Sequence, residues 1–340
     1  MGRKAKEINI SMIAREAGVS ESTVSRALNH RANVGEATRK KIHALAKSLN
    51  FTLTPAAPQH KKIALLTGSY HSEYSGGIFT GIYKYAVTHD LSTTILIKHD
   101  HRKRTFLEEV REQQCAGVII LNSAGCNHDL NAMAKSDLPV ILIDEAIYLD
   151  GVGFVDHDSY SGSREAAKYL LELGHRNIGY IEYVTNSLNR IQRKKAYENV
   201  MSEAGIEIQP EWLVKAKPYD NLYQGSFYAM QKLLKQAPEL TAVMTYNDTI
   251  AIGGIKGALA MGRKIPEDLS IIGFDNYDLT EFIVPALTTV NHPINKIGYL
   301  AAQNIDQYLK ASGNIPLVHD ILPTKLIIRE STAPPKMKIN

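Results

Sequence analysis

Residues 13–29 read IAREAGVSESTVSRALN, and this stretch sets the fold of the N-terminal part of the chain. Apolar residues around its start recur at helical spacing: Ile10, Ile13, Ala14 and Ala17. Gly18 tolerates the left-handed backbone that ends a helix, and Ser20 is a good N-cap for the next one. One face of that second helix is apolar: Val24, Ala27 and Leu28. The stretch therefore predicts two short helices joined by a tight turn.

A third helix is expected from about Glu36 to Leu49. Its apolar side chains again fall on one face: Ile42, Leu45, Ala46 and Leu49. Three short helices with a glycine turn between the first two predict a helix-turn-helix domain. Taken alone, such a trio could also be a protein-binding module.

The charge of the chain is divided unevenly. Residues 1–62 hold twelve Lys and Arg and four acids, a net charge of +8. The remaining 278 residues hold 27 bases and 31 acids, a net charge of −4. A basic block suits a polyanionic partner, although a solvated basic surface is the simpler alternative. Together with the three helices, the block favours duplex DNA.

The polar face of the second helix carries groups that suit base edges. Arg26 can donate two hydrogen bonds to guanine, Glu21 can accept one from cytosine, and Ser22 suits several bases. Other residues suit phosphates and thereby the register on DNA: Thr23, Ser25, Asn29 and Arg39.

After residue 61, apolar runs of strand length alternate with amphipathic stretches. The strand candidates are 62–67, 93–98, 117–122, 139–144, 177–182, 242–247 and 270–274. Apolar strands separated by helices predict parallel sheets covered on both faces. A break near 156–161 then gives an α/β core of two doubly wound parallel-sheet subdomains. A helix over 294–311 and a strand over 325–330 would complete them, with chain crossings near 156–161, 289–292 and 321–325.

Two long stretches of the sequence resemble the LacI/GalR family of bacterial transcription regulators. One is residues 13–29 with the following VGEATRKKIHALAKSLNF (34–51), and the other comprises GRKIPEDLSIIGFDN (262–276), PALTTV (285–290) and LIIREST (326–332). The resemblance implies that Glu21, Ser22 and Arg26 read the operator. It also implies a core similar to the type I periplasmic-binding-protein fold.

On this basis we expect three segments. They are a helix-turn-helix DNA-binding domain over 1–54, a linker or hinge over 55–61 and an effector-binding and dimerisation core over 62–340. Within the core, the N-subdomain would span about 62–158 and 292–322, and the C-subdomain about 159–290 and 323–332.

The linker departs from the family pattern. It reads TLTPAAPQHKK (52–62), without the alanine-arginine segment and the leucine that form a minor-groove hinge helix in the family. Pro58 lacks an amide donor and crowds a preceding helical turn. Either DNA bending and effector coupling differ in this chain, or the segment only tethers the heads.

Polar residues cluster where the predicted strands end, which is where open α/β sheets bind ligands: 69–74, 144–145, 247–248 and 275–276. Short acids and amides suit the paired hydrogen bonds of a polyol, and an aromatic ring can cover a sugar face. Each candidate residue could instead have a purely structural role. Asp248 is expected to cap the next helix, Asp144 and Asp275 could satisfy loop amides, and Arg193 could be a solvated charge.

The family resemblance sharpens the list of effector-binding candidates. It implies roles for Asp158, Arg193, Asn247 and Asp275, to which the strand-end pattern adds Asp144. Tyr74 is the aromatic residue retained after the first strand, and Tyr219 is a weaker stacking candidate. Ala196 stands where the family has glycine, and Ser159 where it has asparagine.

Other features argue against other classes of protein. Cys115 and Cys126 form no CxxC pair, which indicates a reducing compartment. The sequence has no signal-peptide pattern and no apolar stretch of membrane-spanning length, so we expect a cytoplasmic location and no membrane partner. KHDHRKR (98–104) is interpreted as a solvated loop, and 253–262 as a packed helix. No catalytic arrangement is evident, so no enzyme activity, cofactor or metal is expected.

We therefore expect a repressor that binds a pseudo-palindromic operator as a homodimer and responds to a small-molecule effector, for which a sugar or sugar derivative is favoured. No long heptad tail follows Thr332, which favours dimers over tetramers. A nucleoside is the alternative effector. A solute-binding protein of a transport system and an enzyme on a doubly wound fold are the rival classes, and the basic helical head argues against the first.

Overall fold

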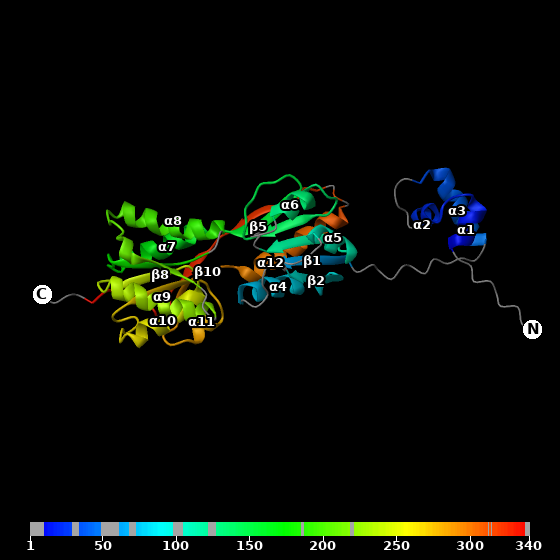
Figure 1. Ribbon diagram of the computed structural model, residues 1–340. Coiled ribbons are helices and arrows are strands. Elements are labelled where there is room, and N and C mark those ends of the chain that lie inside the picture. Colours follow the sequence, from blue (N-terminus) through cyan, green and yellow to red (C-terminus); the bar gives the residue numbers. More distant parts are fainter. Residues whose placement is uncertain are drawn as a thin grey trace, which may run out of the picture. The chain divides into compact units, whose positions relative to one another are not determined.

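The computed structural model describes most of the chain, in the ranges 10–28, 34–48, 61–67, 73–97, 105–121, 127–184, 187–217, 221–311, 313 and 315–336. The chain divides into two compact units, Met1–His60 and Lys61–Asn340. Figure 1 shows the first as helices alone and the second as sheets flanked by helices.

Three short helices form the N-terminal unit: α1 (Ile10–Ala17), α2 (Glu21–Leu28) and α3 (Glu36–Ser48). Gly18 takes the left-handed backbone at φ +70°, as the predicted turn requires. The apolar faces meet in one small core: Ile13, Ala14, Ala17, Val24, Ala27, Ile42 and Ala46. The helix-turn-helix prediction is confirmed, while Leu49 and the whole 52–60 part of the linker lie outside the described residues.

The first sheet of the core unit is entirely parallel, in the order β11-β5-β4-β3-β1-β2. Its strands are β1 (Lys61–Thr67), β2 (Leu91–Ile97), β3 (Gly117–Leu121), β4 (Val140–Ile143), β5 (Val152–His157) and β11 (His319–Leu322). Alternate residues of a strand point to opposite faces, so β1 contributes Ile63 and Leu65 to one core and Ala64 and Leu66 to another.

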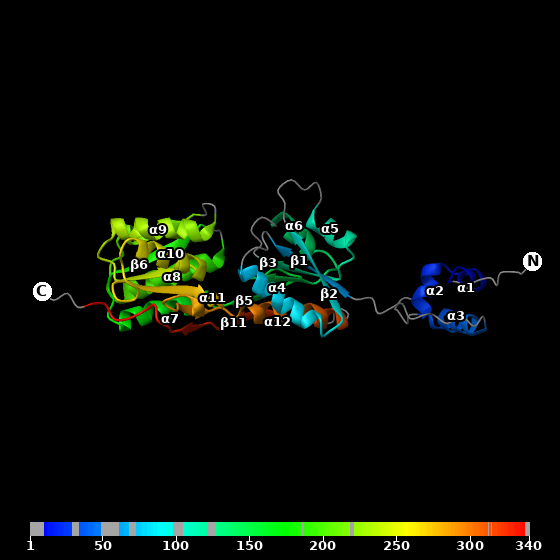
Figure 2. The same cartoon turned by 90° about the horizontal axis from the view of Figure 1, so that it is seen from below.

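Helices cover both faces of this sheet. The core that contains Ile63 is closed by α4 (Glu73–Ala86) and α12 (Ile294–Lys310), and the core that contains Ala64 by α5 (Phe106–Glu112) and α6 (Asn127–Ala134). Figure 2 shows α4 beside α12, with α5 and α6 across the sheet. Glycines permit the close approach of α4 and α12: a side chain at Gly81 or Gly298 would collide with the backbone of the facing helix.

The second sheet has the order β12-β10-β9-β8-β6-β7, and only the β10–β12 pair is antiparallel. Its strands are β6 (Ile178–Tyr183), β7 (Leu213–Ala216), β8 (Ala242–Thr245), β9 (Ser270–Asp275), β10 (Thr288–Asn291) and β12 (Lys325–Ile327). α7 (Ser159–Glu172) and α8 (Leu188–Glu203) cover one face, and α9 (Leu222–Gln236) and α10 (Asp248–Ala260) the other (Figures 1 and 2). A short helix, α11 (Leu279–Phe282), follows β9, and a 3-10 turn (Pro210–Trp212) precedes β7.

The chain passes between the two sheets three times: from β5 into α7, from β10 into α12, and from β11 into β12. The fold class predicted from the sequence, a helix-turn-helix followed by two doubly wound subdomains, is thereby confirmed. Four strands were absent from the strand candidates: β5, β7, β10 and β11. Residues 156–157, which were placed in the break between subdomains, belong to β5. No helix in the described ranges is both long and apolar enough to span a bilayer.

Candidate functional site

The recognition helix α2 carries most of the predicted DNA-binding residues. Glu21 is exposed in its first turn and accepts a hydrogen bond from the Ser11 hydroxyl of α1. The Thr23 hydroxyl pairs with Ser20 Oγ at 2.8 Å, so it also takes part in the helix cap. Arg39 lies in the first turn of α3 and is half-buried.

The other predicted DNA contacts are placed only in part. Ser22, Ser25 and Arg26 lie within α2, but their side chains are outside the described part of the structure, as is the whole of Asn29. The helix itself is nevertheless fixed by Val24 and Ala27, both fully buried.

In the core, two predicted acids lie at the ends of strands from different sheets. Asp144 follows β4 and Asp275 ends β9, and both are buried. Both have a left-handed backbone, with φ 60° at Asp144 and 117° at Asp275, which is uncommon for residues other than glycine. Strained backbone of this kind concentrates at functional sites.

His292, between β10 and α12, joins the two acids. Its Nδ1 lies 3.3 Å from Asp275 Oδ1, and its Nε2 lies 3.5 Å from Asp144 Oδ1. Its ring also stacks on Tyr74, with centroids 5.7 Å apart. The two sheets are therefore connected at the crossing by one buried imidazole that faces a carboxylate from each.

A second histidine, His157 at the end of β5, stacks on His292 with centroids 3.6 Å apart. Its Nε2 lies 2.8 Å from Ser159 Oγ and 3.2 Å from Arg193 Nη2. A guanidinium can only donate, so this Nε2 accepts and the ring proton is on Nδ1. Nδ1 then donates to Asp144 Oδ1, 3.2 Å away.

Arg193 completes this group, which we call the hinge cluster: Asp144, His157, Arg193, Asp275 and His292. The guanidinium is buried against Phe274, with 3.5 Å from its central carbon to the ring centroid. It donates to the Tyr246 carbonyl at 2.7 Å, to Ser159 Oγ at 3.2 Å and to Asp275 Oδ1 at 3.4 Å. The alternative of a solvated charge is therefore wrong for Arg193.

Ionisation in the hinge cluster follows from these contacts. Burial lowers the pKa of His292, but Asp144 and Asp275 outweigh it and raise that pKa to about 9. Burial likewise raises the pKa of Asp144, yet His292 and His157 hold it well below its ordinary value. The cluster thus contains a charged His292 between two carboxylates, beside a charged Arg193.

The remaining predicted effector residues are not members of the hinge cluster. Asn247 caps α10 by accepting from the Ile250 amide at 3.0 Å, and Asp158 caps α7 by accepting from the Ser161 amide at 2.8 Å. Tyr74 Oη is buried and has no hydrogen-bond partner of good geometry among the described residues. Burial, followed by Asp144, raises the pKa of Tyr74 well above its ordinary value. Tyr219 lies outside the described ranges.

The prediction that Asp248 caps the next helix is wrong, because Asn247 takes that position. Asp248 is instead fully buried and accepts from Thr289 Oγ1 at 2.5 Å and from the Tyr277 amide at 3.0 Å. It therefore links the loop after β9 to β10. Burial and then Asp275 raise its pKa to about 7, against the opposing hydrogen bonds.

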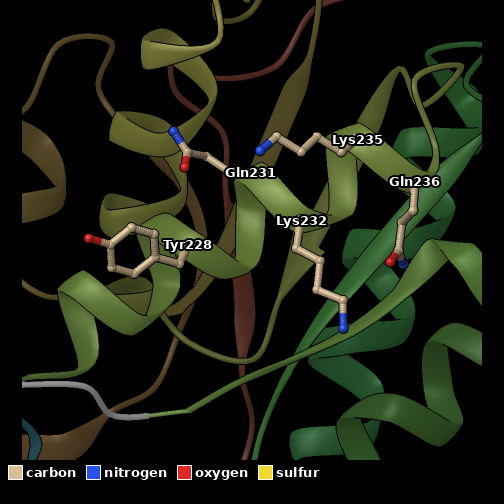
Figure 3. Close-up of a pocket in the computed structure, with 5 residues that line it drawn as sticks. All are labelled: Tyr228, Gln231, Lys232, Lys235 and Gln236. Carbon is tan, nitrogen blue, oxygen red and sulfur yellow. The ribbon is translucent and has the colours of Figure 1, made fainter.

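In the described part of the structure, one hollow adjoins the hinge cluster and another lies on α9. A groove of about 740 Å³ borders the hinge cluster between α4, the loop before α11 and the start of α12, and Asp275 and His292 reach its wall. Figure 3 shows another of about 450 Å³ on α9, lined by Tyr228, Gln231, Lys232, Lys235 and Gln236. All five side chains come from one exposed helix surface and none is a buried polar group, so the hinge cluster is the better candidate site.

His157 and His292 were missed by the sequence analysis. Each adjoins a predicted crossing, at 156–161 and 289–292, and that proximity was the available signal. Neither belongs to a recognisable motif by spacing, because 135 residues separate them. Only the pairing of β5 and β10 with their sheets brings the two rings together.

Comparisons with known proteins agree with this architecture. Residues 9–53 match the model of bacterial regulatory proteins of the lacI family, and residues 167–332 match that of a periplasmic binding protein-like domain. The HTH-type transcriptional regulator DegA of Bacillus subtilis is 32% identical over 338 residues, which covers 95% of this chain and 97% of that protein. The probable HTH-type transcriptional repressor ExuR of the same species is 30% identical, with 88% and 90% covered.

Solved structures give the same result. A LacI family regulator from Enterococcus faecium with bound ribose has 27% identity and a TM-score of 0.71, and covers 81% of this chain and 100% of that one. The lac repressor dimer bound to operator shares the fold, with 20% identity, a TM-score of 0.66, and 96% and 100% covered.

A helix-turn-helix head joined to a periplasmic-binding-protein-like core defines a class of ligand-responsive, DNA-binding transcriptional repressors. The chain belongs to the LacI family of bacterial regulatory proteins.

Proposed function

We propose that operator binding by this repressor is controlled by a small polyhydroxylated effector, a sugar or sugar derivative, bound beside the hinge cluster between the two sheets of the core. The observation that carries the proposal is the buried Arg193–Asp275 pair of one subdomain, which His292 links to Asp144 of the other. A guanidinium and two carboxylates supply donors and acceptors in the pairs that vicinal hydroxyls need. The relative with bound ribose adds support.

The effector acts by competing with contacts that the chain makes with itself. Arg193 now donates to His157 and Asp275, and His292 lies between the two acids. A ligand that replaces some of these bonds favours a different arrangement of the subdomains by its difference in affinity, typically about 1–3 kcal/mol of coupling. The proposed effector residues remain Tyr74, Asp144, Asp158, Arg193, Tyr219, Asn247 and Asp275, with the caps Asp158 and Asn247 acting through helix position.

Base recognition is proposed for Arg26, Glu21 and Ser22 on α2, with Thr23, Ser25, Asn29 and Arg39 fixing the register. One three-helix head covers few base pairs, so two heads on a pseudo-palindromic operator are required for specificity. We therefore propose a homodimer.

Exposed apolar side chains support the homodimer. Phe282 and Val284, in and after α11, are 78% and 87% exposed, and Tyr83 of α4 is 54% exposed. α4 and α11 border the same groove of about 740 Å³. Val284→Asp should raise the dimer dissociation constant in analytical ultracentrifugation, whereas Tyr148→Ser, at another largely exposed site after β4, should not. Equal effects of the two changes would count against this face.

A nucleoside is the second candidate effector. The stacked rings of His157 and His292, with Tyr74 beside them, provide flat surfaces that would suit a planar base. A sugar would need only one such surface and more polar partners.

The decisive experiment has two stages. Full-length protein should first enrich particular duplexes from a random pool at moderate salt. Sugars, sugar derivatives and nucleosides should then be screened for a shift in operator affinity and for turnover. Asp275→Asn should abolish the response and retain operator binding. No enriched duplex would refute the DNA proposal, and turnover without any effect on DNA would support an enzyme instead.

A further inference from the structure

Three side chains that can bind a metal converge at the crossings between the sheets. Asp144, His157 and His292 each place a ligand atom within 4.8 Å of the others, and all three are buried. They come from the end of β4, the end of β5 and the segment between β10 and α12. Two of them lie on the chain crossings themselves.

Two of the three separations between ligand atoms fit a single small cation. Asp144 Oδ1 lies 3.2 Å from His157 Nδ1 and 3.5 Å from His292 Nε2. Tetrahedral zinc, with bonds of about 2.0–2.2 Å, holds its ligand atoms roughly 3.3–3.5 Å apart. His292 Nε2 is buried, faces Asp144, and makes no hydrogen bond of good geometry within the described ranges. A metal ion would displace the Nε2 proton of the charged His292, and the lone pair freed in this way, directed towards Asp144, would coordinate the ion.

Groups outside these three would hold the imidazoles in place. His292 Nδ1 faces Asp275 Oδ1 at 3.3 Å, which is the carboxylate–histidine arrangement that supports metal ligands. His157 Nε2 faces Ser159 Oγ at 2.8 Å, and that hydroxyl oxygen can accept a hydrogen bond from the imidazole. Both supporting residues belong to the subdomain of the second sheet, so an ion here would link the two subdomains.

We propose that Asp144, His157 and His292 bind one divalent transition-metal ion of the zinc type, with one coordination position left open. Metal on His157 Nδ1 moves the ring proton to Nε2, which then donates to Ser159, while Arg193 keeps its bond to Asp275. The lone pairs lie in the ring planes, so binding turns the two stacked rings until both nitrogens point at the ion. This departs from the sequence-based expectation of no metal.

The ligand set also selects the ion. Two imidazoles and one carboxylate suit Zn²⁺, Co²⁺ or Ni²⁺, whereas Mg²⁺ and Ca²⁺ prefer sites made only of oxygen. Asp275→Asn would keep the three ligands but weaken the support of His292, and such changes typically cost about 10–100-fold in metal affinity.

The test is a Co²⁺ titration of chelator-treated, full-length protein, followed by displacement with Zn²⁺. We expect one ion per chain, visible absorption bands of tetrahedral cobalt, and loss of both in His157→Gln/His292→Gln. Asp144→Asn should also weaken binding, which provides a second variant should the double variant not fold. Mg²⁺ should produce no displacement.

Two controls separate this site from other histidines. His99→Gln/His101→Gln removes the histidines of the 98–104 segment, and His319→Gln removes one that bonds the Val152 carbonyl. Both controls should bind one Co²⁺ like the parent protein. The proposal is overturned by folded parent protein without tetrahedral cobalt bands, or by binding that survives in the hinge variants and disappears in either control.

Discussion

The head and the hinge of this repressor use polar side chains in opposite ways. In α2 the apolar residues form a small core and Glu21 is presented to solvent. In the hinge cluster the polar residues are themselves buried, and each charge is balanced by a neighbour. Changes on the exposed face of α2 should therefore alter DNA binding and leave stability nearly unchanged, whereas changes in the hinge cluster should alter stability and the response to effector.

The largest expected effect is on the stability of the core. Arg193→Met keeps most of the side-chain length but leaves Asp275 buried without its guanidinium. Removing one partner of a buried ion pair typically costs about 3–5 kcal/mol in the free energy of unfolding. Urea unfolding followed by circular dichroism would measure it.

The matched control is Arg164→Met. Arg164 pairs with Glu203 through two hydrogen bonds of 2.8 and 2.7 Å, but at the solvent-exposed surface. Solvent screens such a pair, so little change in stability is expected. If the two variants lost equal stability, burial would not be what distinguishes the hinge.

The next effect is a pH dependence that arises from Asp248. Its pKa is raised from 3.8 to about 7 in the folded protein, first by burial and then by Asp275. As the pH rises from about 4 to 7, the unfolded state ionises first, so the free energy of unfolding falls; above about 7 it no longer depends on this group. At about 1.4 kcal/mol per pKa unit, the rise from 3.8 to about 7 corresponds to a loss on the order of 4 kcal/mol.

Asp248→Asn isolates this contribution. The amide oxygen can still accept from Tyr277, and its NH₂ can donate to Thr289 Oγ1. The difference in stability between parent and variant should therefore change between pH 4 and 7 and stay constant from 7 to 8.5. A constant difference across the whole range would mean that Asp248 is ionised throughout.

The fold class could be predicted from the sequence because helical spacing and apolar runs indicated one consistent architecture. Helical spacing identified α1 to α3, and apolar runs identified strands such as β1, which is buried on both faces. Strands with polar or small residues escaped the pattern. β7 reads LVKA, with Lys215 exposed, and β11 reads HDIL at the sheet edge, with no fully buried residue.

The candidate site was only partly predictable for a different reason. Asp144, Arg193 and Asp275 could be chosen because strand ends and family resemblance both point to them. His157 and His292 acquire their role from the crossing of two chain segments, which no local spacing encodes. The helix cap was assigned to Asp248 instead of Asn247 because both residue types cap helices equally well. The choice between them depends on which side chain the core can bury.

A substitution in the head should have a smaller and more selective effect, which falls on DNA binding. Arg26→Ala is expected to cost about 1–3 kcal/mol of operator affinity and to relax the base preference at one position of each half-site. Thermal unfolding of the variant should match that of the parent protein, in contrast to Arg193→Met. Affinities for a set of single-base operator variants would measure the effect. A uniform loss for every operator would assign Arg26 to the phosphate backbone.

Arg39→Ala should produce the smallest effect and one of a different kind. Arg39 lies in the first turn of α3 and is proposed to contact phosphate. Losing a phosphate contact weakens all duplexes alike and lowers the slope of log affinity against log salt by about 1. Fluorescence anisotropy with operator and random duplexes between low and moderate salt would show it. A loss confined to the operator, with an unchanged salt slope, would instead place Arg39 among the residues that read bases, and the distinction between α2 and α3 within the head would no longer hold.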